Sequence, residues 1–241
     1  MKTLSVSLTQ ALALSLVLTA GSTFAGDITG KVTFKGTAPK EKEIKFDQVC
    51  GAMHSTPVTT RHYVVSGDGG LANVFVYISK GAEGKGTAPT TPVMLDQHDC
   101  MYQPYIIGAM VNQKIQIKNS DAVLHNVHAL PKVDGNNEFN FAQPIQGQTD
   151  ERSFPKQEVL VKFKCEVHDW MFAYVGVCDN PYFAVTDKDG KFTIKDVPPG
   201  NYTLTAYHLK THGATKGISK DIKVEGAPTT ADFTVELPAA K

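Results

Sequence analysis

The stretch from Cys165 to Met171 reads Cys-Glu-Val-His-Asp-Trp-Met, and the rest of the chain is organised around it. It follows a segment in which apolar residues at positions 159, 161 and 163 alternate with the residues between them. Because successive side chains on a strand point to opposite faces, Cys165 is predicted to share a face with these three apolar residues. His168 and Met171 follow on a loop short enough to bring both side chains beside the cysteine.

A thiolate, an imidazole and a thioether within seven residues form a set of candidate metal ligands. Two His nitrogens and one Cys sulfur in a trigonal arrangement, with a weak axial Met, are the ligands of blue copper. His125 supplies the missing imidazole, at the point where an upstream loop enters a predicted strand. The sequence therefore predicts that one copper ion binds to His125, Cys165, His168 and Met171.

Two other metal groups fit this pattern less well. Zinc prefers several Cys or His ligands and does not favour Met, and no second Cys stands at metal spacing. Haem c is disfavoured because the chain has no Cys-x-x-Cys-His stretch. His128 comes three residues after His125, so on a strand it would face the opposite side, and it is predicted to be exposed.

The Cys165 to Met171 run resembles the ligand loop of the cupredoxins, and its spacing is similar to that of the amicyanin type. The resemblance covers roughly residues 92 to 178 and includes Tyr-Gln-Pro at 102–104, Asn-Ser-Asp at 119–121 and His-Asn-Val at 125–127. It implies a Greek-key β-sandwich with one type 1 copper, and it places the Asn126 side chain between the His and Cys loops. Asp169 and Trp170 stand where amicyanin-type loops carry a Pro-Phe pair.

The remaining segments are short, rich in Val, Ile, Thr, Tyr and Phe, and separated by Gly, Pro, Asp and Asn, which predicts an all-β chain. Strands are expected at 28–34, 62–65 and 73–78, followed by a linker over 81–91. Further strands are expected at 182–186 and 191–194, on either side of a tight Asp/Gly turn, and again at 201–207.

The downstream part resembles the transthyretin-like, carboxypeptidase regulatory-type β-sandwich, through Thr-Asp-x-x-Gly-x-Phe at 186–192 and Pro-Pro-Gly-x-Tyr-x-Leu at 198–204. The opening strands of such a module stand upstream, at 30–34 and 74–76. We therefore expect a discontinuous domain, residues 26–91 and 182–241, into which the cupredoxin domain, residues 92–181, is inserted or to which it is joined. The whole order also resembles bacterial periplasmic proteins labelled methylamine-utilisation proteins.

The first 25 residues carry Lys2, an apolar run at 11–20 and small residues before Gly26, which predicts a cleaved signal peptide and a periplasmic protein. The apolar run is too short to span a bilayer, so no membrane span is expected. The formal net charge of zero argues against a nucleic-acid partner.

The chain has four cysteines, and an oxidising compartment permits disulfides. With Cys165 assigned to copper, Cys50 and Cys100 are predicted to pair, because both lie in polar, turn-rich segments. Cys178 is predicted to stay unpaired and to point away from the core face, which Val175 and Val177 would fill.

The predicted ligand set supports two main classes of function. An electron carrier needs a buried, fully ligated copper and a redox protein partner. A copper-handling protein or a periplasmic copper enzyme subunit needs an exchangeable or open ligand position. The closed set of four ligands favours the carrier over an enzyme, and an adhesion or scaffold module with a vestigial copper loop is the least favoured reading.

Overall fold

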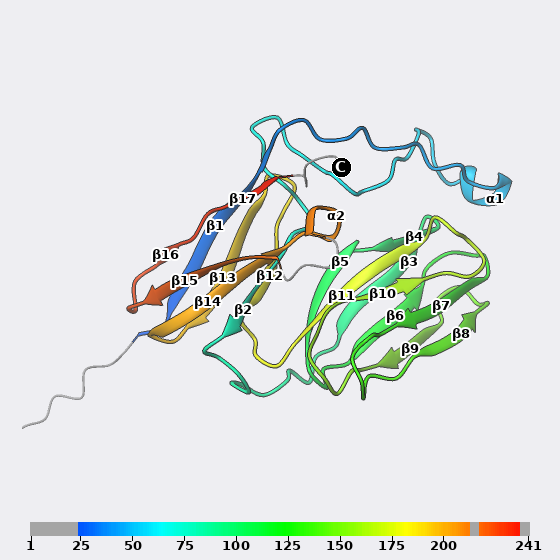
Figure 1. Ribbon diagram of the computed structural model, residues 1–241. Helices are drawn as coiled ribbons and strands as arrows, with labels where there is room; N and C mark the ends of the chain where they lie inside the picture. The colour runs from blue at the N-terminus through cyan, green and yellow to red at the C-terminus, as the bar shows by residue number, and fades with distance from the viewer. Residues whose placement is uncertain (1–23, 213–216, 237–241) are drawn as a thin grey trace, which may run out of the picture.

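The computed structural model describes residues 24–212 and 217–236, so nearly all of the predicted signal peptide lies outside the described residues. The described chain is all-β, as predicted (Figure 1). Neither of its two one-turn helices is long or apolar enough to cross a membrane. The elements are β1 Gly26–Lys35, α1 Gln48–Gly51, β2 Phe75–Lys80, β3 Val93–His98, β4 Met101–Gln103, β5 Ile106–Met110, β6 Ile115–Asn119, β7 His125–Leu130, β8 Phe139–Gln143, β9 Thr149–Arg152, β10 Glu158–Lys164, β11 Phe172–Cys178, β12 Phe183–Val185, β13 Lys191–Val197, β14 Gly200–Tyr207, α2 Leu209–His212, β15 Ile218–Val224, β16 Thr229–Thr230 and β17 Phe233–Glu236.

The strands form two β-sandwiches, which lie side by side in Figure 1. The first sandwich has one sheet of order β13-β1-β16, with β17 also paired to β1, and a second of order β12-β2-β14-β15. The second sandwich has one sheet of order β5-β11-β10-β7-β8 and another of order β4-β3-β6-β9. Each sandwich encloses its own cluster of buried apolar side chains.

Both sheets of the first sandwich combine strands from the two ends of the chain. In one sheet β1 pairs with β13 and β17, and in the other β2 pairs with β12 and β14. The second sandwich is built from one continuous run, β3 to β11. We therefore propose that residues 26–91 and 182–241 form one discontinuous domain around residues 92–181.

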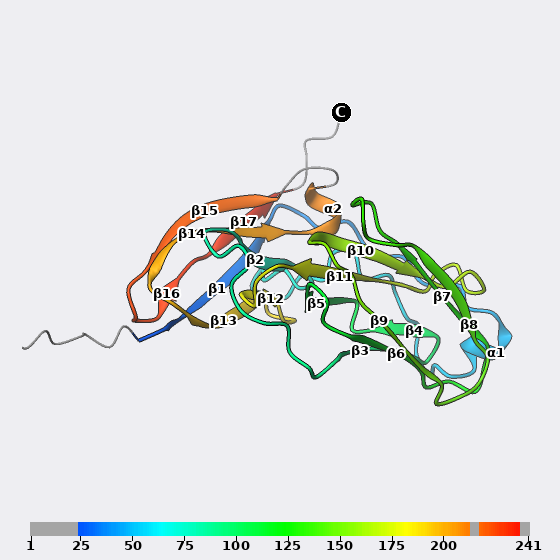
Figure 2. The same cartoon turned by 90° about the horizontal axis from the view of Figure 1, so that it is seen from below.

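A third apolar cluster joins the two sandwiches face to face (Figure 2). Alternate residues of β2 point to opposite faces, so Val76 packs in the first core whereas Phe75 packs against the second sandwich. Gly108 of β5 and Gly176 of β11 are paired neighbours, and their missing side chains leave room for the ring of Phe75. The four sheets therefore stack as four layers around three apolar clusters.

Replacing Gly176 with alanine is expected to destabilise the protein by about 1–3 kcal/mol, the usual cost of overpacking. The added methyl would lie 2.6 Å from Cε1 of Phe75, a ring that is fully buried and has no room to shift. Chemical denaturation measures the loss. Gly67→Ala is the control, because a Cβ there meets nothing within 4 Å. Equal stability of the two variants would contradict the close packing of the two sandwiches.

Residues 36–66, here called the arm, leave the first sandwich and run along the second to α1 before returning (Figure 1). The strand predicted at 62–65 is wrong, because this returning segment makes only an isolated bridge between Val65 and Leu71. Its side chains divide between the two sandwiches: Arg61 lies 4.6 Å over the Tyr105 ring and His62 stacks on Phe172, whereas Tyr63 and Val65 pack against the first core.

Two further local expectations differ from the structure. Leu160 adopts a positive φ of 60°, and the pairing of β10 with β11 shifts there, so Val159 does not share the face of Val161 and Phe163. The Asp187–Gly190 turn does join β12 to β13, but the two strands enter different sheets, because each pairs with a strand from the start of the chain.

Candidate metal centre

Strand pairing brings the predicted ligand loops to one end of the second sandwich. His125 opens β7, Cys165 directly follows β10, and these two strands are antiparallel neighbours. The loop between β10 and β11 is closed by two backbone bonds: the Cys165 amide donates to the Met171 carbonyl at 3.0 Å, and the Met171 amide to the His168 carbonyl at 3.0 Å. His168 is therefore held on a tight turn beside Cys165.

Three of the four predicted ligands converge. The Nδ1 atoms of His125 and His168 are 3.1 Å apart, and the Cys165 sulfur is 3.7 Å from Nδ1 of His168. Ligand atoms about 2.0 to 2.3 Å from one ion are roughly 3 to 4 Å from each other, so this spacing fits a single bound metal. The three side chains are only 0%, 2% and 5% exposed for His125, Cys165 and His168.

Met171 is fully buried in the same apolar cluster as Cys165. Its backbone closes the ligand loop, which places its side chain at the base of the turn that carries His168. Axial coordination by the thioether stays a prediction.

The surroundings of Cys165 favour a thiolate. Burial by itself raises the pKa of this thiol, but hydrogen bonds from His125 and His168 and from the backbone amides of Asn126 and Val167 lower the pKa to about 6. The thiolate is the form that binds metals. The donor set is therefore two imidazoles and one thiolate, which fits the predicted copper.

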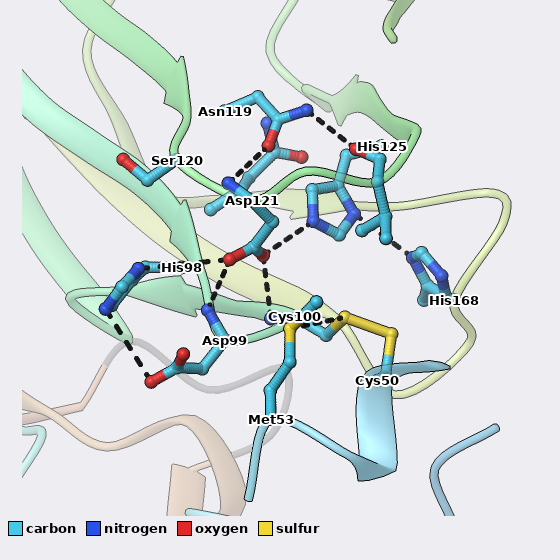
Figure 3. Close-up of polar contacts among 12 residues, drawn as sticks. Cys50, Met53, His98, Asp99, Cys100, Asn119, Ser120, Asp121, His125 and His168 are labelled. Atoms are coloured by element: carbon cyan, nitrogen blue, oxygen red, sulfur yellow. Dashed lines mark hydrogen bonds and ion pairs between the residues drawn. A yellow bond between two sulfur atoms is a disulfide. The ribbon is translucent and has the colours of Figure 1, made fainter. Parts of the chain in front are cut away.

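Asp121 orients His125 from the side opposite the metal position (Figure 3). Its Oδ2 accepts a hydrogen bond from Nε2 of His125 at 2.8 Å, which leaves Nδ1 free to face Cys165 and His168. Burial lowers the pKa of His125, but the bonds to Asp121 and Cys165 outweigh this and raise it. A carboxylate on the outer nitrogen is a common support for a metal-binding histidine.

Asn126 lies between the two ligand segments, where the resemblance places it. Its backbone N–H donates to the Cys165 sulfur at 3.3 Å, and its side-chain oxygen accepts from the backbone N–H of Glu166 at 3.2 Å. The Tyr102 hydroxyl donates to the Asn126 carbonyl at 3.1 Å from below. These bonds hold the strand that carries His125 against the loop that carries Cys165.

The arm covers the His168 side of the site. Cys50, in α1, forms a disulfide with Cys100, the pair that the sequence predicts. Trp170 donates from Nε1 to the Cys100 carbonyl at 3.0 Å and meets Phe46 of the arm edge-on. Trp170 thus holds the loop against Cys100 and Phe46, at one of the two positions where amicyanin-type loops carry a Pro-Phe pair.

The prediction that His128 is exposed is wrong. Its ring does point away from His125, but it is buried between the carboxylates of Glu138 and Glu166, which contact its two nitrogens. Burial lowers the pKa of His128, and the hydrogen bonds to Glu166 and Glu138 outweigh this and raise it. His128 therefore fastens β7 to the start of the ligand loop.

Replacing His128 with glutamine is expected to cost stability mainly in acid. A raised folded-state pKa contributes stability that is fully present below the unfolded value of about 6.5 and is lost as the pH rises through the raised pKa. Chemical denaturation of both proteins at about pH 5.5 and about pH 9 measures this, with a larger deficit expected at the lower pH. The same deficit at both pH values would contradict the charge pairing.

Cys178 is unpaired, and it does point away from Val175 and Val177. The side it faces is not open, however, because β2 and its neighbours cover it and leave the thiol 1% exposed. Burial raises the pKa of this thiol, so Cys178 is an apolar packing residue of the interface.

Sequence reasoning missed two carboxylates at the site. Asp121 lies four residues before His125, inside the stretch that resembles the cupredoxins, so its position carried a usable signal. Asp47 lies 3.6 Å from Nε2 of His168 across a separation of more than a hundred residues. No local pattern indicates that contact.

The comparisons with known proteins match only part of the chain. Residues 162–232 match the family model described as polysaccharide lyase family 4, domain II, which is less than half of the chain and a different family from the transthyretin-like one. The transthyretin-like resemblance therefore stays a prediction. A search of curated protein sequences finds no significant relative.

Among solved structures, the chain is similar to three copper-related proteins. The copper-containing nitrite reductase from Thermus scotoductus SA-01 is 19% identical over 42% of this chain and 25% of that one, with a TM-score of 0.33. A purple cupredoxin from Nitrosopumilus maritimus is 22% identical over 35% and 98%, with a TM-score of 0.30. An oxidised mutant of amicyanin is 19% identical over 42% and 97%, with a TM-score of 0.33. These sequence identities and TM-scores are low, and the assignment of the site rests on the geometry of its own residues.

Proposed function

We propose that this protein binds one copper ion through His125, Cys165, His168 and Met171 and carries single electrons in the periplasm. The observation that carries this proposal is the convergence of one thiolate and two imidazole nitrogens in a buried pocket, with the two Nδ1 atoms 3.1 Å apart. Copper bound there would supply a one-electron change of valence.

The protein's own part is to hold the ligands still. The Asp121 carboxylate fixes His125, and the backbone N–H of Asn126 fixes the Cys165 sulfur. The turn that Met171 closes holds His168. Because these hydrogen bonds and the turn restrain the ligand side chains, a change of valence would require little rearrangement of the ligands. This favours electron transfer over catalysis, which needs room for a substrate at the metal.

The partner is proposed to be another redox protein outside the cytoplasm, consistent with the predicted signal peptide. The alternative, a copper-handling protein or a subunit of a copper enzyme, predicts that copper leaves readily or binds an added ligand. The buried donors argue against both, because none of the three is more than 5% exposed.

Titration of the metal-free protein with Cu(II) tests the proposal. We expect an intense visible band from thiolate-to-copper charge transfer that saturates at one equivalent, and that a one-electron reductant bleaches reversibly. Unchanged colour on addition of azide or another small anion would separate the carrier from an enzyme with an open position. A colourless protein that takes up only zinc would overturn the proposal.

A further inference from the structure

The far end of the arm, residues 46–54, covers the metal centre from outside the second sandwich and is here called the capping segment. Four contacts hold it there: the Cys50–Cys100 disulfide, the edge-on packing of Phe46 against Trp170, a hydrogen bond between His54 Nε2 and the Asp99 carbonyl at 2.9 Å, and a 3.8 Å contact between the sulfurs of Met53 and Cys100. Figure 3 shows the Cys50–Cys100 disulfide beside His168, with Met53 against Cys100.

A carboxylate lies near each of the two imidazoles of the centre, as a hydrogen bond at His125 and as a longer ion-pair contact at His168. Each turns Nδ1 toward the other and Nε2 toward a carboxylate. For His125 this carboxylate is Asp121, at 2.8 Å, within the second sandwich. For His168 it is Asp47 of the capping segment, at 3.6 Å. The support of one ligand therefore comes from a segment that reaches the site from the first sandwich.

The disulfide connects these two carboxylates. The Cys100 amide donates to Asp121 Oδ2 at 2.8 Å, and the Cys50 amide donates to Asp47 Oδ1 at 2.8 Å, which makes Asp47 the N-cap of α1. The bond between the two sulfurs thus fixes the separation of two groups that each face a ligand histidine. His125 also has the strand β7 to hold it, whereas His168 has only its loop.

We propose that the capping segment is a disulfide-locked clamp, in which Asp47 positions His168 and closes the centre, so that reduction of Cys50–Cys100 loosens the metal. The proposal rests on the proposed function, and it adds that the redox state of the disulfide controls how tightly the same site holds its metal. In the reduction, a dithiol donates two electrons and two protons, the sulfur-sulfur bond breaks, Cys50 and Cys100 become thiols, and the dithiol closes to its own disulfide.

Of the four contacts named above, the disulfide is the covalent one. A single helical turn is not stable by itself. The N-cap Asp47 and the first two residues of α1, Gln48 and Val49, are exposed. The Asp47 side chain is 49% exposed, so its attraction to His168 is weak and does not by itself hold the segment in place. Breaking the disulfide would allow the capping segment to move away from His168.

The first test is the rate at which excess EDTA removes copper from the loaded protein. Cys50→Ser/Cys100→Ser is expected to release copper about 10- to 100-fold faster, the usual effect of losing a support of a metal ligand. Asp47→Ser keeps an N-cap acceptor for the Cys50 amide but does not reach His168, and it is expected to speed release and shift the visible band. Lys45→Ser is the matched control, because Lys45 pairs with Glu43 on the exposed surface of the arm. Wild-type release rates and spectra in both test variants would overturn the clamp.

The second test uses metal-free protein, so that it does not depend on copper binding. Trp170 is the chain's single tryptophan, and it contacts both Cys100 and Phe46, so its fluorescence reports whether the capping segment is in place. A dithiol is expected to change this emission in the wild type and not in Cys50→Ser/Cys100→Ser. No change in the wild type once both thiols are titratable would overturn the clamp. A protein that passes this test but gives no copper colour would overturn the proposed function alone.

Discussion

Copper-loaded protein in which Cys165 is replaced by serine is expected to lose its intense visible band completely. The band requires charge transfer from a thiolate to Cu(II), and Cys165 is the one sulfur of the cluster that it forms with His125 and His168. A hydroxyl also lacks the lowered pKa that makes Cys165 a thiolate near neutral pH. Absorption spectroscopy with parallel metal analysis measures the loss.

Cys178→Ser is the control for this prediction, because Cys178 is also a free, buried thiol but lies in the interface between the sandwiches. It is expected to keep the band. A band that survives in Cys165→Ser, or that disappears in Cys178→Ser while copper stays bound, would place the sulfur ligand elsewhere.

A fragment of residues 182–241 is expected not to fold. Five of its described strands lose a partner, because β13, β16 and β17 pair with β1, whereas β12 and β14 pair with β2. Only the pairing of β14 with β15 remains among its long strands, and an isolated hairpin is marginally stable at best. Amide dispersion in a proton-nitrogen NMR spectrum and thermal melting measure the outcome.

Joining residues 26–91 to residues 182–241 through a short Gly/Ser linker is expected to restore folding. The segment that returns to the first sandwich lies beside β2, the last strand before the cupredoxin-like run, since the Asn180 side chain donates to the Ile78 carbonyl at 3.1 Å. Phe75 and Phe183, which the excision uncovers, are replaced by threonine to keep the product soluble. Dispersed resonances and cooperative melting of the 182–241 fragment by itself would show that the discontinuous domain is wrong.

The arrangement of the ligand loop could be predicted from the sequence because neighbours in space are there also neighbours along the chain. The Cys50–Cys100 disulfide joins distant segments and was predicted from the kind of segment in which each cysteine lies. Cys165, His168 and Met171 lie on one turn, and strand alternation correctly turned Cys165 inward with Val161 and Phe163. The same alternation failed at Val159, because it cannot show that Leu160 adopts a positive φ.

The parts that could not be predicted depend on segments that meet only after folding. Strand parity placed His128 opposite His125, but its burial comes from Glu138 and Glu166, which two other segments supply. Likewise, a helix cap at Asp47 is readable from local sequence, whereas its approach to His168 depends on the path of the whole arm. Local patterns thus grouped the candidate ligands of the loop and missed the carboxylates that surround them.

The glycine pair Gly108 and Gly176 has a consequence for how the molecule moves in solution. Because Phe75 fits against these two positions and other apolar side chains pack around it, the two sandwiches are in direct contact through buried side chains. They should therefore tumble as one particle, with a single rotational correlation time for both halves. A protein bound to the first sandwich would then meet the candidate metal centre in one fixed orientation.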